Sequence, residues 1–525
     1  MYAPISIKKV WMLSFEYSGI TKLGGLGEAV ALMSTELANR GFEVTVVMPS
    51  HGVSPKNFKE LDIVCRGDRY GVDGNIYPYD LGFLEGYVDK VKVILIRGRD
   101  NRTSSVIDVW PPYSYADEKA CLLARGALCL AQALGYPDIV HVNDWHSALA
   151  GALLKSVAEV NGYALPTLYQ IHLRGSPSYP WHYASEAWLG IPDILQRIWS
   201  VHRHEFLSTR YLWDSCWGNI ECFMVKIADA IATVSRSEVD SLAHDYGEWI
   251  RGKCCYIYNS TSWSIREVEE IAKRVYRSID RVEIRWKVVE DVINKTHLWG
   301  YIDLKDGDIL VVSSGRLTSQ KGFDTLIHSA RHLPHSIKIL ILGKSVGDYG
   351  YENYLRSLLG DVLGKVAIVY DGLDLDMYKV LIYVSHLYVL PSRYEPFGIS
   401  GIEALSIGTP LVVSNTGGLS EYVGDLRATP LGVGIKVPSG DVYELAKAIQ
   451  SLGYLMFYSE TGRGLEKIVY RELRDIVLRE PRYGEKIREF SISYIDSYFR
   501  PKHTVNSLIS CYELARRMAY YRACT

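Results

Sequence analysis

The sequence lacks long hydrophobic runs and any surplus of positive charge. No stretch approaches the about 18 apolar residues of a membrane-spanning helix, and the first residues contain no signal-peptide core. The 58 Lys and Arg residues are balanced by 60 Asp and Glu residues, which gives a net charge of −2. Such a balance gives no bulk attraction for nucleic acid or for an anionic membrane. We therefore expect a cytoplasmic protein with no nucleic-acid partner and no membrane partner.

Motifs for metals, disulfide scaffolds and serine nucleophiles are also missing. The nine cysteines are scattered and form no CxxC pair, which argues against a secreted disulfide scaffold. We expect them to be buried small apolar residues in a reducing compartment. There is no HExxH, no Cys/His cluster and no GxSxG, so neither a metal site nor a serine-hydrolase nucleophile is expected.

The length of 525 residues and the alternation of apolar runs with amphipathic stretches predict two α/β domains. KKVWMLSFE is typical of a buried strand, and the helix that follows is expected to end at Gly41, which tolerates a left-handed conformation. The same rhythm restarts at DILVVSSG. Near-continuous apolar strands separated by helices indicate parallel, doubly wound sheets that are buried on both faces.

The pattern predicts four segments. Residues 1–255 form the first domain, a charged helical connector or insertion covers 256–300, and residues 301–485 form the second domain. Helices over 486–525 are expected to pack back on the first domain. Ligands of such sheets bind beyond the carboxyl ends of the strands, so the informative residues should lie in loops that follow strands, in a cleft between the domains.

The first such loop is Lys22–Glu28 (KLGGLGE), which follows the first strand and opens a helix. Glycines let the backbone approach a ligand, and helix-start N–H groups with a nearby lysine favour an anion. The loop is neither a Walker loop nor GxGxxG. The alternative is a plain tight turn with a solvated lysine.

The second loop is Gly315–Gly322 (GRLTSQKG), in the same position of the second domain. Arg316 can bind a phosphate through two N–H groups, and Lys321 adds a point charge. The two loops together would neutralise a diphosphate without Mg²⁺. The alternative is that they are unrelated surface loops.

Two acids and one more glycine-rich turn follow later strands. Glu395 lies on a loop after HLYVLPS, and Glu403 lies about one turn into the next helix, where it can reach the hydroxyls of a ribose. A charge that merely suits the helix N-terminus would explain Glu395 better than Glu403. The turn Thr416–Leu419 (TGGL) follows PLVVSN.

Polar residues also end two strands of the first domain. Asp144 and His146 follow DIVHVN, and His172 ends PTLYQIH. These side chains can bind sugar hydroxyls, although a structural histidine is the simpler interpretation of either ring alone.

Taken together, the motifs resemble the glycogen/starch synthase family of retaining glycosyltransferases. The most specific pieces are KLGGLGE, HVNDWH, GRLTSQKG, the EPFG loop with its second glutamate, and NTGGL, in this order along the chain. The resemblance implies the GT-B fold, in which two Rossmann-like domains flank a catalytic cleft. It implies no cofactor other than the donor substrate, a nucleotide sugar, and an α-glucan acceptor.

The resemblance also assigns roles by position. The catalytic positions are Arg316, Lys321, Glu395 and His146. Lys22, Gly24 and Gly25 correspond to the diphosphate-binding loop, and Glu403 corresponds to the residue near the ribose. Asp144 and His172 would lie near the transferred glucose. Backbone N–H groups from Thr416, Gly417, Gly418 and Leu419 would reach the distal phosphate or the sugar.

Three departures from the bacterial pattern leave the donor base and the acceptor details open. The loop reads KLGGL rather than KTGGL, Leu173-Arg174-Gly175 replaces the usual continuation after His172, and Tyr258-Asn259-Ser260-Thr261 stands where NGVD is usual. The expected activity is glucose transfer from ADP-glucose or UDP-glucose to an α-1,4-glucan. Alternatives are a trehalose- or sucrose-type transferase with a small acceptor, and an inactive glucan-binding protein on the same scaffold.

Overall fold

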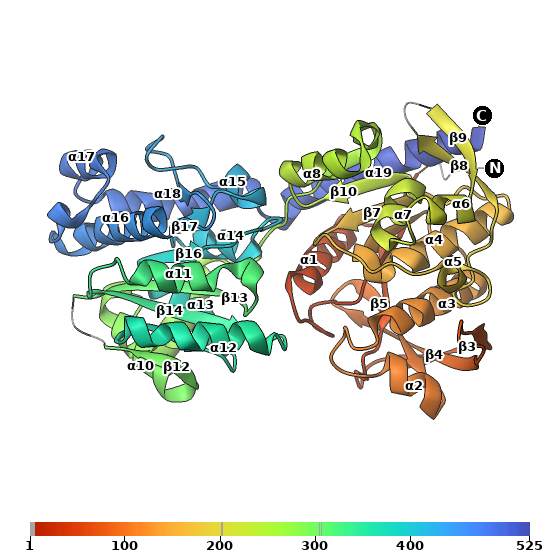
Figure 1. Cartoon of the computed structure of the whole chain (residues 1–525), viewed down its shortest axis with the longest axis horizontal. Helices are drawn as coiled ribbons and strands as arrows, with labels where there is room; N and C mark the ends of the chain where they lie inside the picture. The colour runs from red at the N-terminus through yellow and green to blue at the C-terminus, as the bar shows by residue number, and fades with distance from the viewer. Residues whose placement is uncertain (1–5, 201–202, 304, 306, 525) are drawn as a thin grey trace. The chain divides into compact units, whose positions relative to one another are not determined.

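The structure, a computed structural model, describes residues 6–200, 203–303, 305 and 307–524 (Figure 1). The chain divides into two compact units. Unit 1 lies within Met1–Asn259 and Pro501–Thr525, and unit 2 lies within Ser260–Arg500. Each unit is built around its own sheet. No helix in the described ranges is both long and apolar enough to cross a bilayer.

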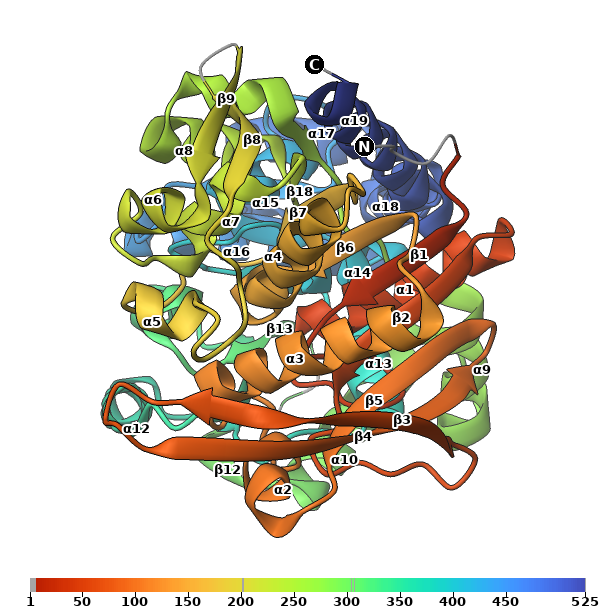
Figure 2. The ribbon, with the colours of Figure 1, turned by 90° about the vertical axis from the view of Figure 1, so that its right-hand side faces the viewer.

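Unit 1 contains a mostly parallel sheet, which has nine strands within the described residues, in the order β11-β10-β7-β6-β1-β2-β5-β4-β3. Strands β3 and β4 form an antiparallel extension at the edge beyond β5, as Figure 2 shows. The strands are β1 (Lys9–Leu13), β2 (Glu43–Pro49), β3 (Lys59–Tyr70), β4 (Ile76–Val88), β5 (Val91–Gly98), β6 (Ile139–Asn143), β7 (Thr167–Ile171), β10 (Ala230–Thr233) and β11 (Cys254–Tyr256).

Helices cover both faces of this sheet, and a small antiparallel pair, β8 (Leu195–Ser200) and β9 (Arg203–Ser208), stands apart from it. The helices are α1 (Gly25–Asn39), α2 (Asn101–Ile107), α3 (Ala116–Leu134), α4 (Asp144–Val160), α5 (Trp181–Ala184), α6 (Thr209–Asp214), α7 (Ile220–Ile227), α8 (Arg236–Tyr246), the 3-10 helix η1 (Glu248–Lys253) and α19 (Pro501–Cys524).

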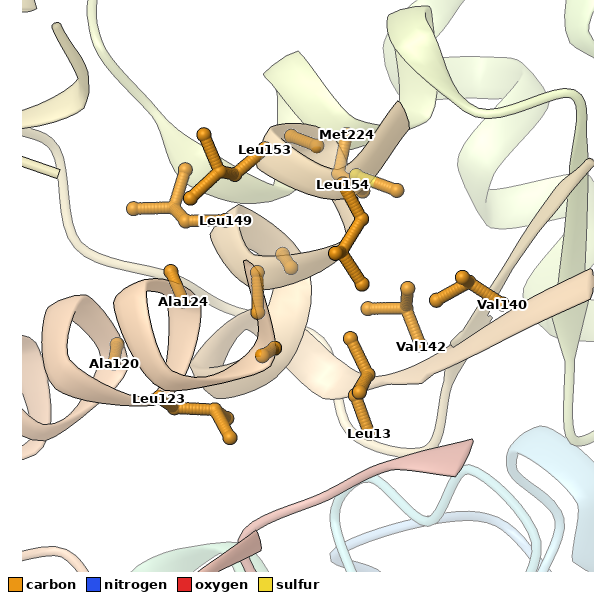
Figure 3. Packing of buried hydrophobic residues seen from close by; sticks show 14 of the residues in the cluster. Leu13, Ala120, Leu123, Ala124, Val140, Val142, Leu149, Leu153, Leu154 and Met224 are labelled. Atoms are coloured by element: carbon orange, nitrogen blue, oxygen red, sulfur yellow. The ribbon is translucent and has the colours of Figure 1, made fainter. Parts of the chain in front are cut away.

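The core of unit 1 lies on both sides of the sheet because successive strand residues point to opposite faces. Val10 and Met12 of β1 pack in the cluster that includes α1 and α19. Leu13 packs on the other face with α3, α4 and α7, as the close-up in Figure 3 shows for Ala124, Leu153 and other residues of that cluster. Burial on both faces explains the continuous apolar runs in the sequence.

Helix α1 ends as the sequence predicts. Its buried side carries Val30, Met33 and Leu37. Gly41 has φ +89 and donates its N–H to Ala38 O at 3.1 Å. Because φ in this range strains a residue with a Cβ, glycine allows the chain to leave the helix and enter β2.

Unit 2 contains a sheet that has seven strands within the described residues, in the order β12-β15-β14-β13-β16-β17-β18, and β12 runs antiparallel to β15. The strands are β12 (Leu298–Ile302), β13 (Ile309–Arg316), β14 (Ile337–Lys344), β15 (Lys365–Val369), β16 (Leu387–Leu390), β17 (Leu411–Ser414) and β18 (Gly434–Val437). The remaining strand pairs in this order are parallel.

Helices follow most strands of unit 2, as expected for repeated β/α units. They are α9 (Ile265–Tyr276), α10 (Arg281–Lys295), η2 (Ser319–Lys321), α11 (Phe323–Ala330), α12 (Tyr349–Leu358), η3 (Leu359–Val362), α13 (Leu375–Val384), α14 (Ile399–Ser406), α15 (Gly417–Tyr422), α16 (Val442–Thr461), η4 (Leu465–Lys467), α17 (Arg471–Arg479) and α18 (Tyr483–Tyr498).

The structure places most of 256–300, predicted as a connector or insertion, within unit 2. Buried Arg285 of α10 contacts both carboxylate oxygens of Glu460 on α16 at 2.9 Å and donates to Val384 O at 2.8 Å. The predicted boundary at 485/486 also shifts. Helix α18 stays with unit 2, packed on α14 and α16, and the chain changes unit at Pro501.

Helix α19 is anchored in unit 1 by polar and covalent contacts. The Tyr512 hydroxyl lies 3.0 Å from His141 Nδ1 in the core, and Arg522 pairs with Asp229 at 3.0 Å. Cys255 of β11 is bonded to Cys511 of α19. These contacts fix the final helix to unit 1.

The cysteine prediction is wrong for six positions. The described residues form the disulfides Cys65–Cys129, Cys216–Cys222 and Cys255–Cys511, whereas Cys121 and Cys254 are free. Partners lie up to 256 residues apart in the chain. Cysteines that are brought together only by the fold show no characteristic spacing in the sequence, so their pairing could not be predicted.

We predict that the loss of Cys255–Cys511 destabilises the protein more than the loss of Cys216–Cys222. A cross-link restricts the unfolded chain more when it closes a longer loop, and the two pairs are 256 and 6 residues apart. The difference should be about 3 kcal/mol in the free energy of unfolding. Denaturant unfolding of C255S/C511S and the matched C216S/C222S protein measures it, and equal losses would contradict the loop-length argument.

Candidate active site

In unit 2, the strand end at Arg316 and the glycine that opens α11 shape the predicted phosphate loop. Arg316 is the last residue of β13, Lys321 lies on η2, and Gly322 follows with φ +65. A Cβ at Gly322 would lie 2.1 Å from Pro391 O. Glycine therefore permits both the turn and the close approach to the segment that follows β16.

The structure brings two of the predicted catalytic residues into contact. Lys321 Nζ donates to Glu395 Oε2 at 2.6 Å, and Ser392 Oγ donates to the same oxygen at 3.0 Å. Glu395 is 6% exposed. A charge-assisted hydrogen bond away from solvent holds the lysine and the acid in a defined geometry.

Two further residues, which the sequence analysis missed, join the same loops. Gln320 Nε2 donates to Tyr394 O at 3.0 Å, and the Arg393 backbone N–H donates to Gln320 O at 2.8 Å. The Arg393 guanidinium binds both oxygens of Asp324 at 2.6 and 2.9 Å. Arg316 contributes a weaker contact, from Nη2 to Gln320 Oε1 at 3.4 Å. The loop after β13 and the loop after β16 thus behave as one structure.

The TGGL segment supports Glu395 and is helical, which corrects its prediction as a turn. Thr416 occupies the N-cap position of α15, which begins at Gly417. Gly417 has φ +48, and a Cβ there would lie 1.9 Å from Glu395 O. The Gly418 N–H donates to Glu395 O and Pro396 O at 3.2 Å, and the Leu419 side chain is buried. The Gly418 N–H is therefore engaged within the protein.

Glu403 lies on α14 near a group of hydroxyls, of which that of Tyr388 belongs to a fully buried residue. Ser314 Oγ lies 2.8 Å from the Tyr378 hydroxyl and also contacts the Tyr388 hydroxyl. Burial, with the adjacent Tyr388 and Glu403, raises the pKa of Tyr378 well above its ordinary value. Tyr378 therefore remains a neutral hydroxyl beside the glutamate.

In unit 1, the predicted polar residues gather at the carboxyl ends of β6 and β7. Asp144 has φ +58, which is rare for a residue other than glycine and is concentrated at functional sites. Its Oδ1 accepts the His172 N–H at 2.7 Å and the Leu173 N–H at 3.3 Å. Burial raises the pKa of Asp144 to about 7.

The contacts of His172 define its protonation. Its Nε2 lies 3.0 Å from Asn143 Oδ1, and Asn143 Nδ2 donates to Leu13 O at 3.1 Å. The amide oxygen of Asn143 therefore faces the ring, so Nε2 is the protonated nitrogen. Burial lowers the pKa of His172 to about 3, so the ring is neutral and Nδ1 is a hydrogen-bond acceptor.

His146 lies in an aromatic setting. Its ring centroid is 4.0 Å from that of Trp145, 4.7 Å from Tyr113 and 5.1 Å from Phe15. Burial lowers its pKa to about 3. Its Nδ1 is buried and has no hydrogen-bond partner among the described residues. The His146 ring is therefore neutral, and its Nδ1 is closed off from solvent.

The glycine-rich loop of unit 1 is held by a residue that the sequence analysis missed. Glu16 Oε2 accepts the Leu23 N–H at 2.7 Å and the Gly24 N–H at 2.9 Å. Lys22 pairs with Glu28 at 2.6 Å, and α1 begins at Gly25. The Gly24 N–H is thus engaged, whereas Gly25 lies at the helix start, where N–H groups lack partners within the helix. Within the described ranges, no group of three His, Cys, Asp or Glu side chains could hold a metal ion.

We predict that Asp144→Asn stabilises the protein increasingly as the pH rises from 3.8 to about 7. The folded state raises the pKa of Asp144 from 3.8 to about 7, so ionisation of the buried carboxyl opposes folding across this window. Asparagine tolerates the left-handed conformation and keeps the acceptor oxygen. Melting temperatures of both proteins over this pH range test the prediction. A constant or shrinking difference would contradict it.

Comparison with known proteins agrees with this organisation. The family model for the starch synthase catalytic domain matches residues 9–252, and the model for glycosyl transferases group 1 matches residues 302–453. A glycogen synthase of Thermotoga petrophila is 27% identical over 474 residues, which cover 86% of this chain and 91% of the relative. A glycogen synthase of Clostridioides difficile is 28% identical over 445 residues, which cover 79% and 85%.

Solved structures support the fold. The catalytic domain of starch synthase IV from Arabidopsis thaliana, bound to ADP and acarbose, aligns with a TM-score of 0.70 and 17% identity, and the alignment covers 97% of this chain and 99% of that one. Sucrose-phosphate synthase from Thermosynechococcus elongatus aligns with a TM-score of 0.58 and 16% identity over 96% and 98% of the chains. The two parallel-sheet units have the Rossmann-like organisation of the GT-B fold. With both family models in this order and glycogen synthases matching most of its length, the chain belongs to the glycogen/starch synthase family of glycosyltransferases.

Proposed function

We propose that this protein is a retaining glycogen or starch synthase. It transfers glucose from a nucleoside diphosphate glucose to the non-reducing end of an α-1,4-glucan. The observation that carries the proposal is the contact of Lys321 with Glu395, beside Arg316, at the carboxyl ends of neighbouring strands in unit 2. The relatives named glycogen synthase support the same activity.

Arg316 and Lys321 stabilise the negative charge that grows on the diphosphate as the bond to glucose breaks. An ammonium group has three N–H donors, and the bond to Glu395 uses one of them. The acid therefore orients the lysine while other N–H groups can meet phosphate oxygens. Arginine adds paired donors that match phosphate geometry. We propose that these cations serve in place of a metal and that no cofactor is needed.

The remaining predicted residues bind the rest of the substrates. Glu403, near the hydroxyls of Tyr378 and Tyr388, binds the ribose. In unit 1, His172 accepts a hydroxyl of the glucose through Nδ1, and His146 and Asp144 lie near the same sugar. Lys22 and the Gly25 N–H bind the diphosphate of the donor. We propose that the enzyme is cytoplasmic and acts without nucleic-acid or membrane partners.

The second candidate is a transferase with a small acceptor. It is favoured by one observation, the shared fold with sucrose-phosphate synthase and with an α,α-trehalose-phosphate synthase from Burkholderia vietnamiensis, each at a TM-score of 0.58. An inactive glucan-binding protein is less consistent with the intact set of Arg316, Lys321, Glu395 and Glu403.

An acceptor comparison tests the function directly. Incubation with ADP-glucose or UDP-glucose should lengthen a maltooligosaccharide primer one glucose at a time, and chromatography of the products measures the ladder. Fructose 6-phosphate and glucose 6-phosphate should not compete as acceptors. Nucleotide release with a sugar phosphate and no ladder would favour the small-acceptor enzyme, and binding of donor without turnover would favour the inactive scaffold.

We predict that Arg316→Ala and Lys321→Ala each lower kcat by about 10²–10³-fold, because each removes a preorganised donor to the leaving diphosphate. The Arg316→Ala protein should melt near the temperature of the unaltered protein, whereas Lys321→Ala leaves the buried Glu395 without its cation and should melt at a lower temperature while remaining folded. Lys447→Ala is the matched control, since Lys447 is exposed on α16 and pairs with Glu444. Ordinary turnover in both loop variants would contradict the assignment.

A further inference from the structure

Glu16 is a buried acid just beyond the end of β1 that joins two loops of unit 1. It is 2% exposed. Its Oε2 accepts the N–H groups of Leu23 and Gly24, and its Oε1 accepts the Tyr113 hydroxyl. A single carboxylate therefore connects the glycine-rich loop with the loop that precedes α3, and neither loop belongs to a strand or helix at these positions.

The backbone of the second loop is held by Lys119. This lysine of α3 is fully buried, and its Nζ donates to Val109 O at 2.6 Å and to Pro112 O at 3.1 Å. Tyr113 is the next residue, and its ring lies 4.7 Å from that of His146. The position of Tyr113 against the proposed sugar-binding histidine thus depends on both Lys119 and Glu16.

His51 links Lys119 to the backbone next to Glu16. Lys119 Nζ lies 3.3 Å from His51 Nδ1, and His51 Nε2 lies 2.9 Å from Phe15 O. An ammonium group can only donate, so Nδ1 accepts and Nε2 donates to the carbonyl beside Glu16. Lys119 donates to His51, His51 donates to the Phe15 carbonyl, and the Tyr113 hydroxyl donates to the Glu16 carboxylate.

The glycine-rich loop is shaped to meet the Glu16 side chain. A Cβ at Gly27 would lie 3.2 Å from Glu16 Cβ and 3.4 Å from Oε2, and one at Gly24 would lie 3.9 Å from Oε1. The Ser18 N–H donates to Gly27 O at 3.0 Å across the same turn. The Glu16 side chain is therefore closely packed against the glycine-rich loop.

We propose that Glu16 is a positioning residue that sets the glycine-rich loop and Tyr113 for glucose transfer; this role rests on the proposed function. The side chain at position 16 must be long enough for its two terminal polar atoms to contact groups on two loops. Glutamine has the same length: its Oε1 can accept the two N–H groups while its Nε2 donates to the Tyr113 oxygen. Aspartate keeps the charge but is one methylene shorter, so it cannot hold both loops.

The test compares Glu16→Gln with Glu16→Asp in the full chain. Glutamine should keep kcat/KM for the donor within about threefold of the unaltered enzyme, and aspartate should lower it about 10²-fold, the effect of a misplacement of about 1 Å. The matched controls are Glu85→Gln and Glu85→Asp. Glu85 of β4 is half-buried and pairs with Lys92 of β5, and both variants should leave kcat/KM unchanged. Activity retained by aspartate and lost by glutamine would show that charge matters and would overturn the proposal.

Hydrogen exchange gives a readout that does not depend on the reaction. In the ligand-free protein, the Leu23 and Gly24 amides should exchange slowly with Glu or Gln at position 16 and fast with Asp. Equal exchange in all three proteins would overturn the proposal even if transfer activity changes. If the unaltered protein transfers no glucose but shows this exchange pattern, the proposed function fails while the loop-holding role of Glu16 stands.

Discussion

Burial of the central strands of each sheet on both faces is the constraint on which the rest of the structure depends. Every residue of β6 is buried, and so is every residue of β16, so neither strand offers a side chain to a ligand along its length. The polar chemistry therefore begins where strands end, at Asp144 after β6 and at Glu395 after β16. The same rule places Arg316 at the last residue of β13. A parallel sheet delivers these ends to one edge of each unit, which is where such folds bind ligands.

Within each unit, side chains rather than backbone ladders hold the functional loops. The Gln320 side chain and the Arg393 guanidinium join the segments after β13 and β16, and Lys321 is oriented by Glu395. Glu16 plays the corresponding part in unit 1. A buried acid that meets charged or N–H donors is stabilising only when those donors are present, so each such acid also fixes the geometry of its neighbours. This arrangement gives preorganisation, which is what the stabilisation of a leaving diphosphate requires.

The sequence was sufficient to predict the class of fold and to place Asp144, Arg316 and Glu395 at the ends of strands, because apolar runs and glycine-rich loops are local signals. It did not predict the β3–β4 extension, since the β3 segment KELDIVCRGDRY mixes charges and apolar residues on an exposed edge. Contacts between distant segments were also out of reach. Lys321 and Glu395 are 74 residues apart and Cys255 and Cys511 are 256 apart, and Glu16 is a lone acid without a motif. For Glu16, the one available signal was its place just beyond the end of the first strand.

The central claim is that protein cations, chiefly Arg316 and Lys321, neutralise the donor diphosphate. The most direct measurement is the rate of primer lengthening by protein treated with EDTA, compared with the same protein supplied with Mg²⁺, using ADP-glucose and UDP-glucose in turn. The account predicts equal rates with and without the metal for the preferred donor. A rate that falls to background in EDTA and returns with Mg²⁺ would contradict it.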